Sequence, residues 1–128
     1  MRISLVTVIV KDQQDALHFY TDVLGFVKKT DITEGDRRWL TVVAPGDQDG
    51  PELVLESNEN PAAATYQRAL FYAGIPMVSF EVPDVRREHD RLSELGVMFS
   101  IEPGGTERAH VAMFNDTCGN LVQIYEKL

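Results

Sequence analysis

Only one cysteine, Cys118, occurs among the 128 residues of this chain. A single cysteine cannot form an internal disulfide, and without a Cys-x-x-Cys pair the chain has no thiol site for zinc or for redox chemistry. This usage predicts a reducing, cytoplasmic location. The chain also lacks low-complexity tracts, and its 44% hydrophobic and 25% charged residues are typical of a globular protein. We therefore expect one compact domain over residues 1–128.

Basic runs and long apolar runs are missing as well. The formal net charge is −8, which argues against nucleic acid and anionic membrane surfaces as partners and is compatible with a cationic small ligand. Acidity that only aids solubility is an equally simple explanation. The opening segment, residues 1–10, is apolar but short and has no small-residue cleavage site, so it predicts a strand rather than a signal peptide.

What the chain does contain is an internal duplication. Leu5-Val-Thr-Val-Ile-Val-Lys-Asp12 recurs as Met77-Val-Ser-Phe-Glu-Val-Pro-Asp84, and each copy is followed by a helical stretch that stops at Leu-Gly. The nearly constant spacing between the copies predicts two examples of one supersecondary unit that share a core. Functional residues are then expected at equivalent positions of both copies.

The first copy, residues 1–57, predicts one strand, one helix and three further strands. Alternating side chains indicate the first strand, and Asp12 is expected to cap a helix that ends at Gly25. Turn-forming residues separate the three later strands, which are expected over 26–32, 38–44 and 52–56.

The second copy, residues 75–128, predicts the same order of elements. Its strand over 77–82 leads to a helix capped by Asp84, and three strands follow over 97–101, 110–114 and 121–126. Residues 60–74 predict a connecting helix that begins at Pro61. The fold class is therefore α+β, built from two βαβββ modules.

Strand alternation also separates two faces of each predicted sheet. If Val6, Val8 and Val10 pack on the helix, the alternate residues point to the opposite, more polar face. That face is a plausible pocket wall, since a few polar groups among apolar ones are typical of ligand sites. The candidate ligand-binding residues are Thr7, Trp39, Thr41, Glu56, Ser79, Glu81, His110, Gln123 and Tyr125.

Two of these candidates have a specific chemical interpretation and a simpler alternative. Trp39 is suited to stacking on a planar or cationic ligand, with Glu56 and Glu81 supplying charge, or it fills the core. His110 would titrate near neutrality and could act as a general base, but a shift of one residue in register would make it an exposed strand residue instead. No catalytic residue is assigned.

Several motifs extend along the chain. They are Val10-Lys-Asp12, Phe19-Tyr-Thr-Asp-Val-Leu-Gly-Phe26, Phe80-Glu-Val-Pro-Asp84, Leu95-Gly-Val97 and Asp116-Thr-Cys-Gly-Asn120. With them the chain resembles the vicinal oxygen chelate superfamily of glyoxalase I, bleomycin-resistance proteins and extradiol dioxygenases. The resemblance implies that the two modules curve into an open half-barrel, commonly in a homodimer, with a ligand cleft on the concave face.

Catalytic members of this superfamily bind a divalent metal through one residue on the first strand and one on the last strand of each module. The matching positions here are Leu5, Val54, Met77 and Gln123. Only Gln123 offers an oxygen, and one amide oxygen does not hold a metal, since catalytic zinc needs about three protein ligands. The resemblance therefore implies the family fold without its usual metal, and we expect no cofactor.

The first functional hypothesis is a protein that binds a small organic molecule in a metal-free cleft, in the manner of the bleomycin-resistance branch. The alternative is a metal-dependent enzyme, either a glyoxalase-type lyase or isomerase or a ring-cleaving dioxygenase. Its metal site would have to be rebuilt from other strand residues such as Glu56, Glu81, His110 and Glu126. A third alternative is a protein whose dimer surface is its function.

Overall fold

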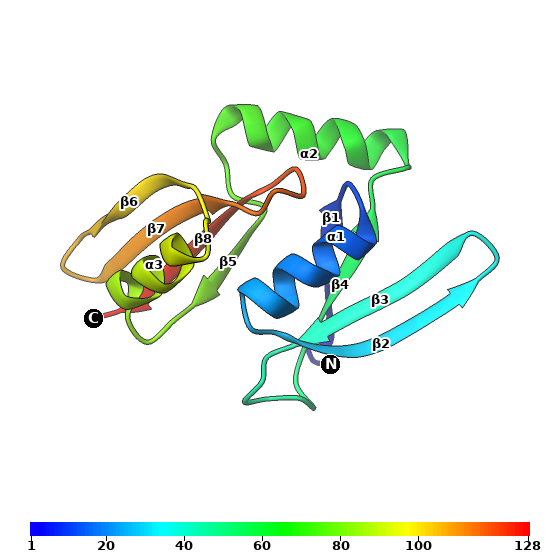
Figure 1. The fold of residues 1–128 in the computed structure, drawn as a ribbon, viewed down its shortest axis with the longest axis horizontal. Coiled ribbons are helices and arrows are strands. Elements are labelled where there is room, and N and C mark those ends of the chain that lie inside the picture. The colour runs from blue at the N-terminus through cyan, green and yellow to red at the C-terminus, as the bar shows by residue number, and fades with distance from the viewer. The chain divides into compact units, whose positions relative to one another are not determined.

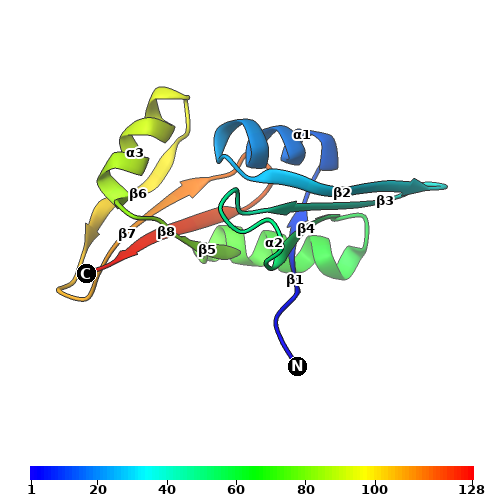
Figure 2. The same ribbon diagram turned by 90° about the horizontal axis from the view of Figure 1, so that it is seen from below.

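Two four-stranded sheets contain all the strands of this protein, one sheet in each half of the chain (Figures 1 and 2). The computed structural model describes residues 1–128 and divides into two units, Met1–Ala64 and Thr65–Leu128. We call them unit 1 and unit 2. Each unit has its own sheet, so each can be described by itself.

Unit 1 has one helical segment against a mixed sheet. The chain runs through β1 (Leu5–Val10), α1 (Gln13–His18), η1 (Phe19–Val23), β2 (Val27–Glu34), β3 (Arg37–Val43) and β4 (Glu52–Ser57). The strand order is β1-β4-β3-β2, with β1 parallel to β4 and the other neighbours antiparallel. The core is aliphatic, with Val8, Val10, Leu40, Val42 and Leu55 fully buried.

Unit 2 repeats this order. After α2 (Pro61–Ala73), which begins at the expected proline, come β5 (Val78–Glu81), α3 (Val85–Glu94), β6 (Phe99–Gly105), β7 (Ala109–Asn115) and β8 (Leu121–Lys127). The strand order β5-β8-β7-β6 and the parallel β5–β8 pair match those of unit 1. The α+β class and the two βαβββ modules are thus confirmed.

Both module helices begin at the predicted aspartates. The backbone N–H of Asp15 donates to Asp12 Oδ1 at 2.8 Å, and that of Arg87 donates to Asp84 Oδ1 at 3.0 Å. These bonds satisfy N–H groups that have no partner within the helix. The caps therefore fix where each helix starts relative to the strand before it.

The first helical segment differs from the expectation of one continuous α-helix up to Gly25. α1 ends at His18, and the next turn is the π-helix η1, in which Leu24 N donates to Phe19 O, five residues back, at 3.0 Å. This wider turn accompanies the burial of two adjacent side chains, Phe19 and Tyr20. Apolar spacing alone does not distinguish such a turn from a regular α-helix.

The turn at residues 116–120 in unit 2 is a buried polar network. Asp116 accepts hydrogen bonds from the backbone N–H groups of Cys118 at 2.7 Å and Asn120 at 3.0 Å, and from Asn120 Nδ2 at 2.9 Å. From α2, Gln67 Nε2 donates to Cys118 O at 3.0 Å and to Asn120 Oδ1 at 3.1 Å. This motif therefore has a structural explanation, since it joins the turn before β8 to α2.

Candidate functional site

A cleft opens in unit 1 where β3 and β4 diverge. The two strands pair only at Thr41 with Val54 and at Val42 with Leu53. Beyond these pairs lies a cleft of about 860 Å³, lined by the first turn of α1, the end of the β2–β3 hairpin, the end of β4 and the chain that follows it. We call it the unit 1 cleft.

The equivalent strands of unit 2 do not diverge in this way. There β7 and β8 pair continuously from Ala109 with Lys127 to Asn115 with Leu121. The two modules therefore share a topology but differ in strand separation at the same place. The duplication by itself does not predict that difference.

The apolar wall of the unit 1 cleft is formed by Trp39 and Ile32. These residues are direct partners across the β2–β3 hairpin, so their side chains lie on the same face of the sheet. Trp39 is 45% exposed and Ile32 is 53% exposed. Two large apolar side chains that remain accessible next to each other form a flat surface on which a planar molecule can stack.

Charged side chains surround this apolar wall. Five carboxylates and three basic groups line the cleft, so its lining is acidic: Asp12, Glu34, Asp36, Glu56 and Glu59 against Lys11, Arg37 and Arg38. One of the basic groups, Arg38, is neutralised by Asp31, whose carboxylate lies 2.8 Å from it. The net field at the cleft therefore favours a cation.

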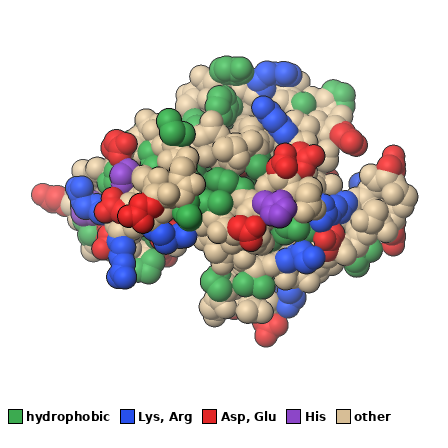
Figure 3. Space-filling model, viewed as in Figure 1, with side chains coloured by type: hydrophobic (Ala, Val, Ile, Leu, Met, Phe, Trp, Pro, Cys, Tyr) green, Lys and Arg blue, Asp and Glu red, His purple; other side chains and the backbone are tan.

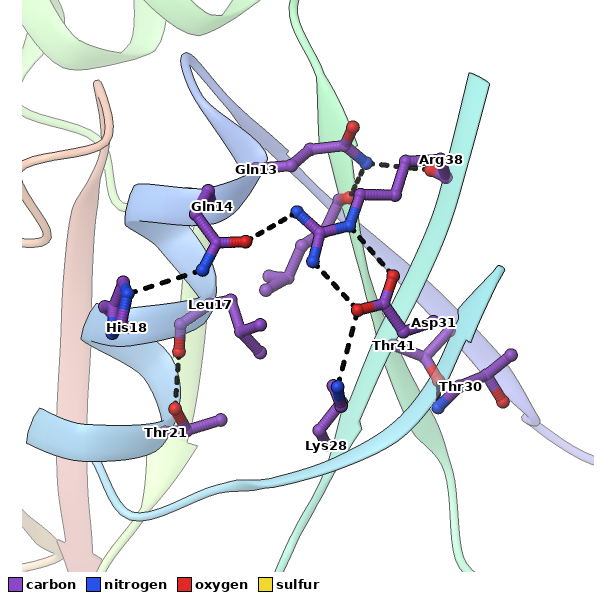
Figure 4. A network of polar contacts seen from close by, with 11 residues as sticks. Gln13, Gln14, Leu17, His18, Thr21, Lys28, Thr30, Asp31, Arg38 and Thr41 are labelled. Atoms are coloured by element: carbon purple, nitrogen blue, oxygen red, sulfur yellow. Dashed lines mark hydrogen bonds and ion pairs between the residues drawn. The ribbon is translucent and has the colours of Figure 1, made fainter. Parts of the chain in front are cut away.

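Arg38 lies at the centre of a polar network that joins α1 to the β2–β3 hairpin (Figure 4). Its Nε and Nη2 donate to the two oxygens of Asp31, each at 2.8 Å, and its Nη1 donates to Gln14 Oε1 at 2.9 Å. Hydrogen bonding to Arg38 lowers the pKa of Asp31 from 3.8 to about 2, and the same bond raises the pKa of Arg38. This geometry is bidentate, which makes it directional as well as electrostatic.

In unit 1 the structure brings two of the four sequence-predicted site residues to the cleft. Trp39 and Glu56 line it, whereas Thr7 and Thr41 do not. Thr41 is fully buried, accepts a hydrogen bond from Thr30 N at 3.1 Å and donates to Glu52 Oε1 at 2.7 Å. Thr7 is exposed on β1, beside Val54 of β4.

In unit 2 four of the predicted residues share one face of the sheet. Ser79 pairs with Gln123, and Glu81 pairs with Tyr125, across the parallel β5–β8 ladder. Ser79 and Glu81 are exposed, whereas Gln123 and Tyr125 are half-buried. Their role in ligand binding stays a prediction.

His110 is separated from these four. It pairs with Glu126 across β7 and β8, so both side chains lie on the face opposite to Gln123 and Tyr125. Its Nδ1 lies 3.2 Å from Glu126 Oε1, which also accepts a hydrogen bond from the backbone N–H of Val85 at the start of α3. On this face His110 takes part in the contact between sheet and helix, and we do not include it in the proposed site.

The positions that correspond to metal ligands in this superfamily do not fit a divalent ion. In unit 1 they are Leu5 and Val54, whose side chains carry no donor atom. In unit 2 the side chain of Met77 offers only a thioether sulfur, which is a poor ligand for a hard cation. Within either unit, no three or more His, Cys, Asp or Glu side chains are grouped so that they could hold a metal ion.

Sequence reasoning missed Ile32 and Gln13 as residues of the cleft. Ile32 could have been found, because a tight turn at Gly35-Asp36 fixes the hairpin register and places Ile32 opposite Trp39. Gln13 gave no such signal. Its side chain is held by backbone carbonyls 25 and 42 residues away in the sequence, and no local pattern indicates such distant partners.

The fold and the duplicated module define the class of this protein. The chain belongs to the Glyoxalase/Bleomycin resistance protein/Dioxygenase superfamily, whose family model matches residues 2–124. This finding confirms the resemblance that the sequence motifs indicated.

Individual relatives cover nearly the whole chain. It is 50% identical over 127 residues to the uncharacterized protein YurT of Bacillus subtilis (strain 168), covering 99% of this chain and 100% of that protein. Its structure is similar to the crystal structure of UcmS2, with 32% identity, 98% and 97% coverage of the two chains, and a TM-score of 0.85. It is also similar to TnmS3, an antibiotic binding protein from Streptomyces sp. CB03234, with 26% identity, 100% and 97% coverage, and a TM-score of 0.78.

Two properties of the chain bear on membranes and nucleic acid as partners. None of the helices is long and apolar enough to cross a membrane. On the face seen in Figure 3, acidic and basic side chains are intermixed rather than gathered into one basic surface. Together with the net charge of −8, this distribution gives no support to nucleic acid as a partner.

Proposed function

We propose that this protein binds a small, planar and positively charged organic molecule in the unit 1 cleft without a metal ion. The observation that carries the proposal is the accessible Trp39, which lies beside Ile32 in a cleft where carboxylates outnumber basic groups. TnmS3, a structural relative over the whole chain, is an antibiotic binding protein. Its description supports a small organic ligand for this chain as well.

The chemistry of the cleft suits such a ligand in three ways. Its volume of about 860 Å³ lies within the range of roughly 300–1,000 Å³ typical of small-molecule sites. The indole of Trp39 offers a face for stacking, and a cation over that face gains on the order of 1 kcal/mol. Glu56, which is exposed on β4 and also lines the cleft, adds direct charge attraction.

Fluorescence of Trp39, the only tryptophan, provides the test. We would titrate the protein with three probes that share one ring system: an aminoacridine cation, neutral acridine and acridine carboxylate. The aminoacridine should quench Trp39 most strongly and bind most tightly, and the carboxylate should bind least. Equal affinity for the three probes would refute the role assigned to the carboxylates.

Calorimetry of two variants separates the cleft from other exposed aromatic groups. Trp39→Ala should weaken aminoacridine binding by about tenfold or more, which is the loss expected for an aromatic anchor. Tyr72→Ala is the matched control, because Tyr72 is 80% exposed and lies on α2, outside the cleft lining. If both variants bind as the native protein does, the unit 1 cleft is not the site.

Elemental analysis tests the metal-dependent alternative of a glyoxalase-type lyase or isomerase or a ring-cleaving dioxygenase. The protein would be purified without chelators and its metal content measured against protein concentration. Our proposal expects no stoichiometric divalent ion, because Leu5, Val54 and Met77 offer no suitable donors. A stoichiometric ion that survives dialysis would contradict the proposal of a metal-free site.

The proposal includes a homodimer, which the family resemblance implies. Exposed apolar residues near the start of the chain, Ile3, Leu5 and Val6, are suited to burial by a partner copy. Sedimentation equilibrium should therefore give twice the chain mass of 14.4 kDa. A purely monomeric protein at micromolar concentration would contradict this part of the proposal.

A further inference from the structure

We infer that Gln13 is a positioning residue that keeps the unit 1 cleft open, because its side chain replaces part of the β3–β4 ladder. This inference rests on the proposed function of the cleft as a ligand site. Gln13 is the first residue of α1 and follows directly after the helix cap Asp12. Its backbone is thus fixed by the cap while its side chain extends between the strands.

The amide group of Gln13 bridges the two diverging strands. Its Nε2 donates to Arg38 O on β3 at 2.9 Å and to Leu55 O on β4 at 2.8 Å. A glutamine amide nitrogen has two N–H donors, so both are used in this bridge. In a continuous ladder such carbonyls accept from N–H groups of the facing strand, and here one side chain satisfies both.

The same residue of β3 is also held through its side chain. Gln14, the next residue of α1, accepts a hydrogen bond from Arg38, and Asp31 of β2 holds the other edge of that guanidinium (Figure 4). Arg38 directly precedes Trp39 in the sequence. Its backbone and side-chain contacts therefore fix the strand that presents the indole to the cleft.

The module of unit 2 has the same topology but no glutamine at the equivalent position. The residue after its helix cap Asp84 is Val85, whose side chain has no hydrogen-bond donor. There β7 and β8 remain paired along their full length, and His110 faces Glu126 where unit 1 has its opening. A closed arrangement is thus accessible to the same βαβββ topology, and the glutamine distinguishes the open module from the closed one.

Two leucine variants test this role. Gln13→Leu keeps a side chain of similar size but removes both donors, so the two carbonyls must find partners on the opposite strand. Gln48→Leu is the matched control, because Gln48 is exposed in the turn between β3 and β4, outside the cleft lining, and its replacement leaves the bridge intact. Far-UV circular dichroism and urea unfolding would establish that both variants fold.

Two measurements are made on each protein. Calorimetry with the aminoacridine cation measures affinity, and we expect Gln13→Leu to weaken it about tenfold, with Gln48→Leu within about twofold of the native protein. Hydrogen exchange of the ligand-free protein measures strand separation directly. In Gln13→Leu the backbone amides of residues 38–40 and 55–57 should exchange more slowly, because the strands pair where they were apart.

The outcomes separate this inference from the proposed function. Slower exchange in Gln13→Leu supports the spacing role even if native protein binds no acridine, a result that would refute only the proposed function. Unchanged exchange and unchanged affinity in Gln13→Leu would overturn the inference while leaving the binding site in place. Faster exchange would overturn it too, because Gln13 would then tie fraying strands together rather than hold them apart.

Discussion

Replacing Asp31 with asparagine is expected to destabilise the β2–β3 hairpin in a pH-dependent way. The carboxylate accepts two hydrogen bonds from Arg38 at 2.8 Å each and lies 3.4 Å from Lys28 Nζ. Asparagine keeps the shape of the side chain but removes the charge. The variant therefore isolates the ionic part of the network in Figure 4.

The magnitude follows from the pKa of Asp31, which Arg38 lowers from 3.8 to about 2. A shift of this size corresponds to roughly 2.5 kcal/mol, at 1.36 kcal/mol per pKa unit. About a fifth of the side chain is exposed, and solvent screens such a pair, so we expect about 1 kcal/mol in practice. Near neutral pH, Asp31→Asn should thus lower the free energy of unfolding by about 1 kcal/mol.

The pH dependence has a definite sign. A carboxyl group whose pKa is lower in the folded state stabilises the fold above its unfolded pKa, and this stabilisation is lost as the pH falls through the folded pKa. For Asp31 the loss extends from about 3.8 down to about 2. The difference between native protein and Asp31→Asn should accordingly be constant above this window and disappear at its lower end.

Urea unfolding at several pH values measures this difference, with Trp39 fluorescence and far-UV circular dichroism as independent signals. Asp36→Asn is the control, because it removes one carboxylate from the adjoining exposed turn. Its effect should be within about 0.5 kcal/mol at every pH. A difference for Asp31→Asn that is absent at neutral pH, or that persists unchanged at the acidic end, would refute the reasoning.

Four further substitutions have expected outcomes, one of them as a control. Gly119→Ala should lower the free energy of unfolding by about 2 kcal/mol in urea titrations, because the residue has φ +99° and an added Cβ would lie 2.6 Å from Gln67 Nε2. Gly104→Ala, whose added Cβ would meet nothing closer than 3.9 Å, should change it by less than about 1 kcal/mol; similar losses for both would contradict the steric argument. Asp116→Ala should cost about 3 kcal/mol by the same measurement, since it leaves three donors without their acceptor, and a loss below about 1 kcal/mol would be inconsistent with a buried network. Glu56→Gln should weaken binding of the aminoacridine cation about threefold in calorimetry and leave neutral acridine unchanged; equal effects on both probes would show that charge is not the cause.

Local signals in the sequence predicted the elements well. Asp12 and Asp84 cap the two helices where expected, and α2 begins at Pro61. Capping and side-chain alternation act over a few residues, so they can be recognised without knowledge of the fold. The π-turn at Phe19–Val23 was not predicted, because its spacing of apolar residues is also compatible with a regular α-helix.

Parts of the site were harder to predict. The polar face of the second module was assigned to Ser79, Glu81, Gln123 and Tyr125, and the β5–β8 register places these four together. His110 lies on the other face of the sheet. Successive side chains of a strand point to opposite faces, so an error of one residue in the register reverses the predicted face.

The duplicated topology, the superfamily and the residues at the four metal-ligand positions could be recognised in the sequence, because each depends only on which amino acid stands at a given position. The place where a cleft opens could be seen only in the folded protein. Whether β3 and β4 continue to pair or separate depends on the hydrogen bonds of Gln13 to Arg38 O and Leu55 O, residues 25 and 42 positions away. Such distant partners are chosen only when the strands and the helix meet, so no local pattern in the chain predicts them.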